Sequence, residues 1–396
     1  MGFNSRLSTF NGKPVQDYDP AKGLEDPANI CYRVGLPWDD DKTKSIAPTL
    51  KKLVADPRAG EIRELVIGRM GDYGVGGDDA LKPIMNSRKL NKLEALMIGD
   101  VTREELEVTW FHLPRFLYTI FSNYKNLRTL HLRGERLFLY RGITHAKLET
   151  LILEVAGLHN DYGAAYLAQS DLPELTHLDL WLGDKYRGDV TTHTLRPILE
   201  GKVFPKLTHL GLRNSAIVDE LAQGLIAAGG GGDDGIDVVG KTCVLTGKLN
   251  NIKRKDAESQ LVAKGAKIGK SVSKNTHILF AGEKAGSKMD KAKGLGVAVY
   301  TEAELLEVLG ITATKAVSDA SGSILERVKV LDLSLGTLTD KGAKALAENP
   351  LVKNLERLDL HHHYMTDAGI KLVEGIGVPV DVSDKQTGEA YPWLVE

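Results

Sequence analysis

Apolar residues recur along this chain in the pattern L-x-x-L-x-L, in which the x positions are mostly polar. Clear copies begin at Leu127, Leu148, Leu175, Leu207, Val328 and Leu355, and weaker copies begin at Ile62 and Leu93. Consecutive clear copies are 21, 27 or 32 residues apart. Because side chains alternate along a strand, each copy predicts a short strand with one buried, leucine-rich face.

Helix start signals lie between the predicted strands. They are Val-Asp-Glu-Leu-Ala at 218–222, Thr-Asp-Lys-Gly-Ala at 339–343 and Thr-Asp-Ala-Gly-Ile at 366–370. A Thr or Asp at a helix start caps free backbone N–H groups. One strand and one helix in each 20 to 30 residues is typical of leucine-rich repeats, in which each copy buries its apolar edge only against its neighbours. The pattern therefore predicts an α/β fold, a leucine-rich-repeat solenoid of parallel strands and helices.

One interval breaks this spacing. The copies at Leu207 and Val328 are 121 residues apart, about 94 more than one repeat needs. The excess is bounded by a Gly-rich run at 229–235 and by a Thr-, Ala- and Ser-rich segment at 312–323, which are typical of flexible linkers. The spacing therefore predicts an independent domain inserted into the solenoid.

The predicted organisation has six parts. They are an N-terminal cap at 1–56, a first set of repeats at 57–228, a Gly-rich linker at 229–237, an inserted domain at 238–310, a linker at 311–323, and a second set of repeats with a C-terminal cap at 324–396.

The inserted segment alternates predicted strands with helices, which favours a small parallel sheet covered by helices. Its motifs are Gly-Lys-Thr-Cys-Val-Leu-Thr-Gly at 240–247, Gly-Ala-Lys at 265–267, Ser-Val-Ser-Lys-Asn-Thr at 271–276 and Ala-Gly-Ser-Lys at 285–288. With these motifs, residues 238–310 resemble a BRCT domain. The subtype it is most similar to is that of NAD-dependent DNA ligases and the large subunit of replication factor C.

This resemblance implies a phosphate pocket formed by the Thr246 hydroxyl, the Gly247 N–H group and Lys288, to which the replication-factor type adds Arg254. A hydroxyl, a glycine amide and a cation at a helix start suit a phosphate chemically. The alternative is structural: Thr246 ends a strand, Gly247 begins a turn, and the domain contacts only proteins. No Lys-x-Asp-Gly nucleotidyl-transfer motif occurs, so the ligase reaction is not implied.

The distribution of charged residues indicates an anionic partner for the inserted segment and not for the rest of the chain. Residues 240–310 contain thirteen Lys and Arg against seven Asp and Glu, whereas the whole chain carries a net charge of −2. A basic module in an acidic protein favours an anionic partner for that module. The resemblance implies a DNA 5′-phosphate end first and a phosphopeptide second, because phosphopeptide readers of the BRCT family usually work as tandem pairs.

The sheet of the solenoid should present polar side chains on the face opposite the motif leucines. The residues expected to bind a protein partner there are His177, Asp179, Trp181, His209, Arg213, Asp332, Asp359 and His361. Aromatic and Arg side chains on a rigid surface often anchor partners, and an exposed Trp181 would favour this interpretation over a merely solvated face.

The run of histidines at 361–363 raises a metal interpretation. Alternation along a strand would let Asp359, His361 and His363 converge beside Asp332, and imidazole with carboxylate suits Zn²⁺ or Fe²⁺. Since no H-E-x-x-H motif occurs, we expect no metal and no cofactor. A metal-dependent hydrolase that uses Asp332, Asp359 and His361 is the least favoured function.

The repeats also resemble a family of mostly uncharacterised bacterial leucine-rich-repeat proteins, through the runs at 178–183, 331–336 and 358–364. That resemblance implies no reaction and no catalytic residues. The chain has two cysteines, no signal-like N-terminus and no long apolar run, so we expect a cytoplasmic protein without a membrane segment.

These observations favour a non-enzymatic scaffold, in which the repeats hold a protein of unknown identity and the insert engages phosphate on DNA. The second interpretation is a scaffold that binds only proteins.

Overall fold

The computed structural model of this chain describes residues 5–37, 45–71, 77–102, 111, 113, 117–137, 139, 141–158, 163–183, 190–227, 236, 238–249, 252–282, 287–309 and 323–391. The chain divides into two compact units, Met1–Gly229 with Ser321–Glu396, and Gly230–Ala320. We call the first the solenoid unit and the second the insert unit. The predicted linker run at 229–235 and all of that at 312–323 except Ser323 lie outside the described residues, as does the Ala-Gly of the motif at 285–288.

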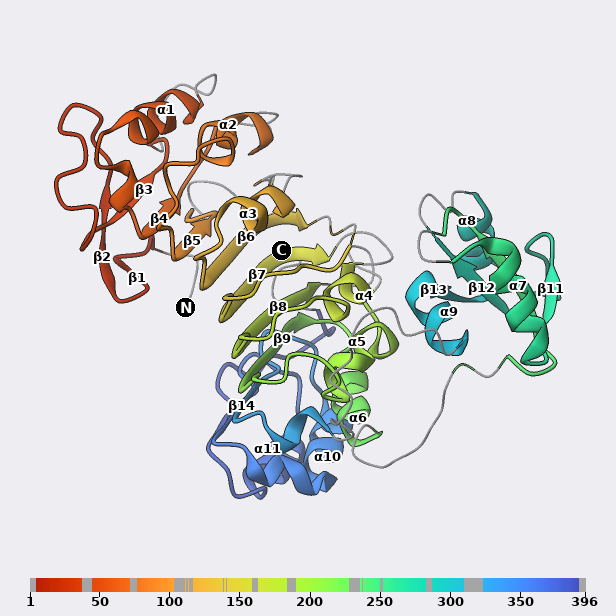
Figure 1. The fold of residues 1–396 in the computed structure, drawn as a ribbon. Coiled ribbons are helices and arrows are strands. Elements are labelled where there is room, and N and C mark those ends of the chain that lie inside the picture. The colour runs from red at the N-terminus through yellow and green to blue at the C-terminus, as the bar shows by residue number, and fades with distance from the viewer. Residues whose placement is uncertain are drawn as a thin grey trace. The chain divides into compact units, whose positions relative to one another are not determined.

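The solenoid unit is organised around one sheet, which has twelve strands within the described residues, in the order β1-β2-β3-β4-β5-β6-β7-β8-β9-β14-β15-β16 (Figure 1). The strands are β1 (Thr9–Phe10), β2 (Lys13–Asp17), β3 (Cys31–Val34), β4 (Glu64–Ile67), β5 (Ala95–Ile98), β6 (Thr129–Leu137), β7 (Thr150–Leu158), β8 (His177–Gly183), β9 (His209–Ser215), β14 (Val330–Asp332), β15 (Arg357–Asp359) and β16 (Val380–Asp381). Strands β2 to β9 and β14 to β16 are parallel, and β1 pairs with β2 in antiparallel fashion.

Each of the eight motif copies contributes one strand, from β4 to β9 and then β14 and β15. Leucines of the motif, such as Leu130, Leu178 and Leu358, are fully buried in a single continuous core. The predicted leucine-rich-repeat fold is therefore confirmed, since every copy packs its apolar face only against the copies beside it.

Helices cover one face of this sheet (Figure 1). They are α1 (Ala47–Ala55), α2 (Gly77–Met85), α3 (Leu117–Asn123), α4 (Gly163–Ala168), α5 (Thr192–Leu199), α6 (Val218–Ala227), α10 (Asp340–Glu348) and α11 (Asp367–Glu374), with 3₁₀ turns η1 (Ala59–Glu61), η3 (Ile324–Glu326) and η4 (Pro350–Asn354). The predicted caps are present at α10 and α11, where the Thr339 and Thr366 hydroxyls accept hydrogen bonds from Lys341 N and Ala368 N.

The N-terminal segment contains more repeat structure than its sequence indicates. Strand β3 pairs in register with β4, and α1 packs against α2, so these elements continue the solenoid. The β1–β2 hairpin brings Phe10 against Cys31 and Val66 on the opposite face of the sheet. This hairpin therefore covers the first strands on the face opposite the described helices.

The repeats continue directly across the insertion. Strand β14 pairs with β9, with Val330 opposite His209 and Leu331 opposite Leu210. The solenoid core therefore does not depend on the insert for its continuity.

The insert unit has a four-stranded parallel sheet within its described residues, in the order β11-β10-β12-β13. Its elements are β10 (Thr242–Thr246), α7 (Arg254–Ala263), β11 (Lys267–Gly269), β12 (Ile278–Ala281), α8 (Ser287–Gly294), β13 (Ala298–Thr301) and α9 (Glu302–Leu309). Successive residues of β10 point to opposite faces of the sheet. Cys243 lies in one apolar core and Val244 in a separate one on the other face. A parallel sheet requires cover on both faces, and the three helices and the loops supply it.

Candidate functional site

The carboxyl edge of the insert sheet is the first candidate site. Thr246 is the last residue of β10 and is 6% exposed, and Gly247 follows it with φ +71. A positive φ is the left-handed region that favours glycine, so the sequence Thr-Gly turns the chain sharply at this edge. The Gly282 N–H group donates to Thr246 O at 2.9 Å, which places the end of β12 beside the turn.

Arg254 fixes this turn from the start of α7. Its Nη1 donates to Leu245 O at 2.6 Å and its Nη2 to Gly247 O at 2.5 Å. The guanidinium thus bridges the backbone on both sides of Thr246, and a planar fork with several donors suits this task. The structure therefore brings Thr246, Gly247 and Arg254 together, with Arg254 bound to the loop itself.

Lys288 is the second residue of α8, and its Nζ donates to Lys270 O at 3.1 Å. Lys270 directly follows β11, the neighbour of β10 in the sheet. The carboxyl ends of β10, β11 and β12 and the starts of α7 and α8 lie at one edge, as the connections of a parallel sheet require. All four predicted phosphate residues belong to this edge.

The opposite edge of the insert sheet offers a contrast. A hollow of about 420 Å³ there is lined by Lys241, Lys274, His277 and Tyr300, among others. It lies at the amino ends of β12 and β13, away from Thr246. Basic side chains are thus present at both edges, so charge alone does not single out one of them.

The face of the solenoid sheet opposite the motif leucines is the second candidate site. We call it the polar face and define it by His131, Arg133, Glu154, His177, Asp179, Trp181, His209, Arg213, Asp332, Asp359 and His361. Its charged groups are largely paired with one another across neighbouring strands. Glu154 accepts from His131 Nε2 at 2.9 Å and from Arg133 Nε at 2.6 Å. Burial alone would raise the pKa of Glu154, but these two partners hold it well below its usual range.

Arg213 forms the centre of a second network. Its Nη1 donates to Asp179 Oδ2 at 3.0 Å, and its Nε lies 3.1 Å from Ser334 Oγ and 3.3 Å from Asp332 Oδ2. Burial raises the pKa of Asp179 to about 6, despite the opposing charge of Arg213. The guanidinium thus joins three strands, β8, β9 and β14.

The expectation that Trp181 is exposed is wrong. Its side chain is 2% exposed, and the Arg213 guanidinium lies 5.8 Å from the ring centroid. Strands β8 and β9 are seven residues long, so the position after the motif lies within the strand and not at its open end. Asp179, Asp332 and Asp359 are also buried, whereas His177, His209, Arg213 and His361 are half-buried.

The expected convergence of His363 with Asp359 and His361 is also wrong. Strand β15 ends at Asp359, and His362 has φ +58, so the alternation of a strand does not continue. His363 is fully buried, with its Nε2 donating to Val382 O at 3.0 Å. It is a structural residue of the core edge.

Of the three residues of the hydrolase hypothesis, Asp332 and Asp359 lie on neighbouring strands and His361 follows β15, but both carboxylates are already engaged. Asp332 and Asp359 are register partners, and His361 Nδ1 bonds Asp359 Oδ1 at 2.7 Å. Asp359 raises the pKa of His361, while Arg213 pairs with Asp332. A general base would have to be released from these ion pairs before it could act.

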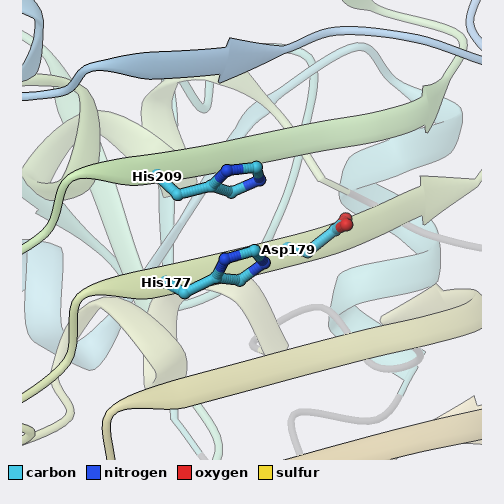
Figure 2. Close-up of side chains that lie close together, drawn as sticks. All are labelled: His177, Asp179 and His209. Atoms are coloured by element: carbon cyan, nitrogen blue, oxygen red, sulfur yellow. The ribbon is translucent and has the colours of Figure 1, made fainter. Parts of the chain in front are cut away.

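Sequence reasoning missed one arrangement on this face. His177 and His209 are register partners on β8 and β9, and their rings stack with centroids 3.8 Å apart and planes 7° apart (Figure 2). Burial, and for His177 also the neighbouring His209, lowers the pKa of each to about 4. The signal was present, because both residues occupy the third position of consecutive motif copies.

Neither cysteine is suited to nucleophilic chemistry. Burial raises the pKa of Cys31 to about 12 and that of Cys243 to about 11. Among the described residues, no helix is long and apolar enough to cross a membrane.

Comparison with known proteins identifies the insert. Residues 239–309 match the BRCA1 C Terminus (BRCT) domain family. DNA ligases from strains of Neisseria meningitidis are 52% identical to this chain over 94 residues, which are 23% of this chain and 10% of each ligase. The chain thus spans a tenth of the length of these relatives, and the likeness concerns the insert and not the ligase as a whole.

Solved structures resemble the chain in its fold. A protein from Bacteroides fragilis has a TM-score of 0.60 at 18% identity, over 92% of this chain and 77% of that chain. An internalin from Listeria monocytogenes has a TM-score of 0.33 at 11% identity, over 92% of this chain and 70% of that chain. The first likeness concerns the fold alone, and the second is too low to carry an argument.

Fold and comparisons together define the class of protein. The chain is a leucine-rich-repeat solenoid that carries a BRCT domain between β9 and β14. Both kinds of module typically serve binding.

Proposed function

We propose that this protein is a non-enzymatic scaffold whose BRCT domain binds a DNA 5′-phosphate at an end or a nick, while its solenoid holds a protein partner. The observation that carries the proposal is the carboxyl edge of the insert sheet. There the Thr246–Gly247 turn, which Arg254 holds in place, and the start of α8 with Lys288 belong to the same edge. A hydroxyl, a glycine amide and an ammonium group are donors that suit a phosphate.

Charge and similarity support the choice of DNA. Residues 240–310 carry six more basic than acidic groups, and such a surface attracts a polyanion. The relatives that are 52% identical over this region are DNA ligases. A DNA phosphate is therefore favoured over a phosphopeptide as the ligand.

The test is a titration of the full chain against duplex DNA containing a single nick, with and without a 5′-phosphate, at about 50 and about 200 mM salt. We expect tighter binding to the phosphorylated nick, and a loss of about tenfold or more in Thr246→Ala and Lys288→Ala, since each removes a bond to a charged group. Thr246→Ser retains the hydroxyl and should retain the preference.

Lys274→Ala is the matched control, because it removes the same charge at the opposite edge of the domain. It should weaken binding to both nicks slightly and equally. If Lys274→Ala abolishes the preference for phosphate while Lys288→Ala leaves it intact, the carboxyl edge is not the site. Equal binding to both nicks would overturn the DNA-end proposal.

A scaffold that binds only proteins is the second candidate, and one observation favours it. Thr246 is 6% exposed and Arg254 already bonds two carbonyl groups, so both residues have structural tasks. In that case the full chain would show no retention on DNA at about 200 mM salt. For the solenoid, the half-buried polar-face residues could touch a partner; they are His131, His177, His209, Arg213 and His361.

A further inference from the structure

The stacked histidines and a neighbouring carboxylate form a compact cluster on the polar face. His177 and Asp179 are two residues apart on β8, so their side chains share a face, and His209 is the register partner of His177 on β9. One ligand atom from each of His177, Asp179 and His209 lies within 4.8 Å of the other two. Figure 2 shows the two rings face to face, with the Asp179 carboxylate beside them.

The two oxygens of the Asp179 carboxylate differ in their hydrogen bonding. Its Oδ2 accepts the bond from Arg213, whereas Oδ1 is buried and has no hydrogen-bond partner among the described residues. Asp179 as a whole is 6% exposed. A buried carboxylate oxygen without a hydrogen-bond partner is unfavourable, so its persistence suggests a ligand for it.

Gly211 keeps the space beside this oxygen open. It lies opposite Asp179 on β9, and a Cβ at this position would lie 2.8 Å from Asp179 Oδ1. The equivalent motif position holds a side chain in the neighbouring copies, for example Asp332 and Asp359. The gap in this row of side chains therefore coincides with the unpartnered oxygen.

We propose that His177, His209 and Asp179 form a binding site for one divalent first-row transition-metal ion. This inference goes beyond the proposed scaffold function and does not depend on it. Two imidazoles and one carboxylate are a ligand set that suits Zn²⁺ or Fe²⁺, and three protein ligands leave at least one position open to water or to a group from a partner. A neutral imidazole is the form that ligates a metal.

The histidines must move to accept the ion. Rings whose planes are 7° apart cannot both direct an in-plane lone pair at one ion. At least one ring must therefore rotate about its Cβ–Cγ bond to bind the ion. Among the described residues, no group hydrogen-bonds to a ring nitrogen of either histidine, so this rotation breaks no hydrogen bond.

Arg213 has a positioning role in this arrangement. Its bond to Asp179 Oδ2 fixes the carboxylate and leaves Oδ1 as the single ligand oxygen. The three ligand atoms surround a single point, so one ion per site is expected.

The experiment is a titration of the untagged, chelator-treated full chain with Zn²⁺ in competition with a chromophoric chelator, followed by elemental analysis. Co²⁺ serves as a second probe, because its visible absorption reports coordination by nitrogen and oxygen. We expect one ion per chain, and a loss of affinity of about tenfold or more in each of His177→Asn and His209→Asn. Wild-type protein should also show a rise in Tm that grows with Zn²⁺ concentration.

His361→Asn is the matched control, because His361 belongs to a second cluster, with Asp359 and Asp381, on the same face. In that cluster His361 Nδ1 already bonds Asp359 Oδ1, and Asp381 Oδ1 accepts from Ser383 Oγ, so these three ligand atoms are engaged. We expect His361→Asn to bind Zn²⁺ as the wild type does. Circular dichroism would verify that all three variants are folded.

Two outcomes would overturn the proposal. One is the absence of saturable Zn²⁺ or Co²⁺ binding in the micromolar range by folded wild-type protein. The other is binding that both His177→Asn and His209→Asn leave unchanged. Neither outcome bears on DNA binding by the insert, so the two proposals fail independently.

Discussion

Asp219 and Thr339 lie 120 residues apart in sequence, yet Thr339 Oγ1 donates a hydrogen bond to Asp219 Oδ2 at 2.5 Å. Asp219 is in the first turn of α6, before the insert, and Thr339 caps α10, after it. Asp219 Oδ1 also accepts from Thr339 N and Gly342 N, at 2.9 and 3.0 Å. The next repeat copies the arrangement, because Asp340 accepts from Thr366 N and Oγ1. An aspartate in each helix thus holds the start of the next helix, and this link continues across the insertion.

Replacing Asp219 with Ala should destabilise the solenoid by about 1–3 kcal/mol, since three donors lose a charged acceptor. Asp219→Asn, which keeps one carbonyl oxygen, should lose less. Asp340→Ala is the matched variant at the next, more exposed helix start, where we expect about 1 kcal/mol or less. All four tryptophans lie outside Gly230–Ala320, so Trp fluorescence during urea unfolding reports on the solenoid alone. A loss below about 0.5 kcal/mol for Asp219→Ala would contradict this account.

Gly342→Ala should destabilise the solenoid although it places a better helix former in α10. In an unobstructed helix, Ala in place of Gly stabilises by about 0.5–1 kcal/mol. At this position the new Cβ would lie 2.4 Å from Asp219 Oδ1 and 2.4 Å from Leu338 Cδ1, so the helices must separate or the hydrogen bonds to Asp219 must break. We expect a net loss of about 1–3 kcal/mol in urea unfolding.

Gly224→Ala is the control for this prediction, since it makes the same change in α6. Its nearest neighbour would be Leu199 Cδ1 at 3.4 Å, which is ordinary contact. This variant should be as stable as the wild type or more stable. Equal effects of the two substitutions would show that helix propensity and not packing decides the result.

The sequence predicts the solenoid well because burial of its leucines is local to each repeat. Leu178 and Leu210, for example, need only their own motif copies to indicate a buried strand position. Strand β3 was missed because Cys-Tyr-Arg-Val lacks the leucine pattern, although Tyr32 and Val34 enter the main core, and the burial of Cys31 depends on the β1–β2 hairpin. In the insert, the three-residue β11 is too short to produce a pattern.

The candidate sites depend on relations that no single repeat contains. Trp181 was expected to be exposed because the sequence does not show that β8 continues past the motif. The His177–His209 pair requires the register between two strands, and Asp179 Oδ1 requires knowledge of which oxygen Arg213 uses. Motif positions place side chains on a face, but only the paired sheet shows which of them meet.

Arg254→Lys should separate a positioning role from a phosphate contact. Lysine retains the charge but cannot donate to Leu245 O and Gly247 O together, as the guanidinium does. If Arg254 acts by holding the Thr246–Gly247 turn, both Arg254→Lys and Arg254→Ala should weaken binding to phosphorylated nicks by about tenfold, with the salt dependence of Arg254→Lys unchanged. Lys264→Ala, at the other end of α7, should have little effect. Full retention of affinity by Arg254→Lys would instead indicate a direct contact with phosphate.

Acid should weaken the solenoid through two buried histidines, His145 and His363. In each, Nε2 donates to a carbonyl oxygen, of Tyr124 or Val382, at 3.0 Å. Nδ1 accepts from a backbone N–H group two residues further on, at 3.3 and 3.1 Å. A proton on Nδ1 would face that N–H group, so the neutral ring is required. Burial lowers the pKa of both histidines below the ordinary value of 6.5.

Below pH 6.5 the two histidines therefore bind protons in the unfolded chain but stay neutral in the folded chain. The free energy of unfolding consequently falls as pH falls. Each histidine contributes up to about 1.4 kcal/mol per pH unit to this fall in the free energy of unfolding. The window begins near pH 6.5 and extends down to the pKa of the histidine in the folded chain.

We expect His145→Gln and His363→Gln to destabilise the solenoid at pH 7.5 by about 1–3 kcal/mol, because each breaks a buried pair of hydrogen bonds. At pH 5.5 the difference in the free energy of unfolding between each variant and the wild type should shrink. Only the wild type is destabilised by protonation of that histidine. Urea unfolding followed by Trp fluorescence at both pH values measures this, with His277→Gln in the insert unit as the control. A difference that stays constant with pH would show that these histidines do not couple protonation to stability.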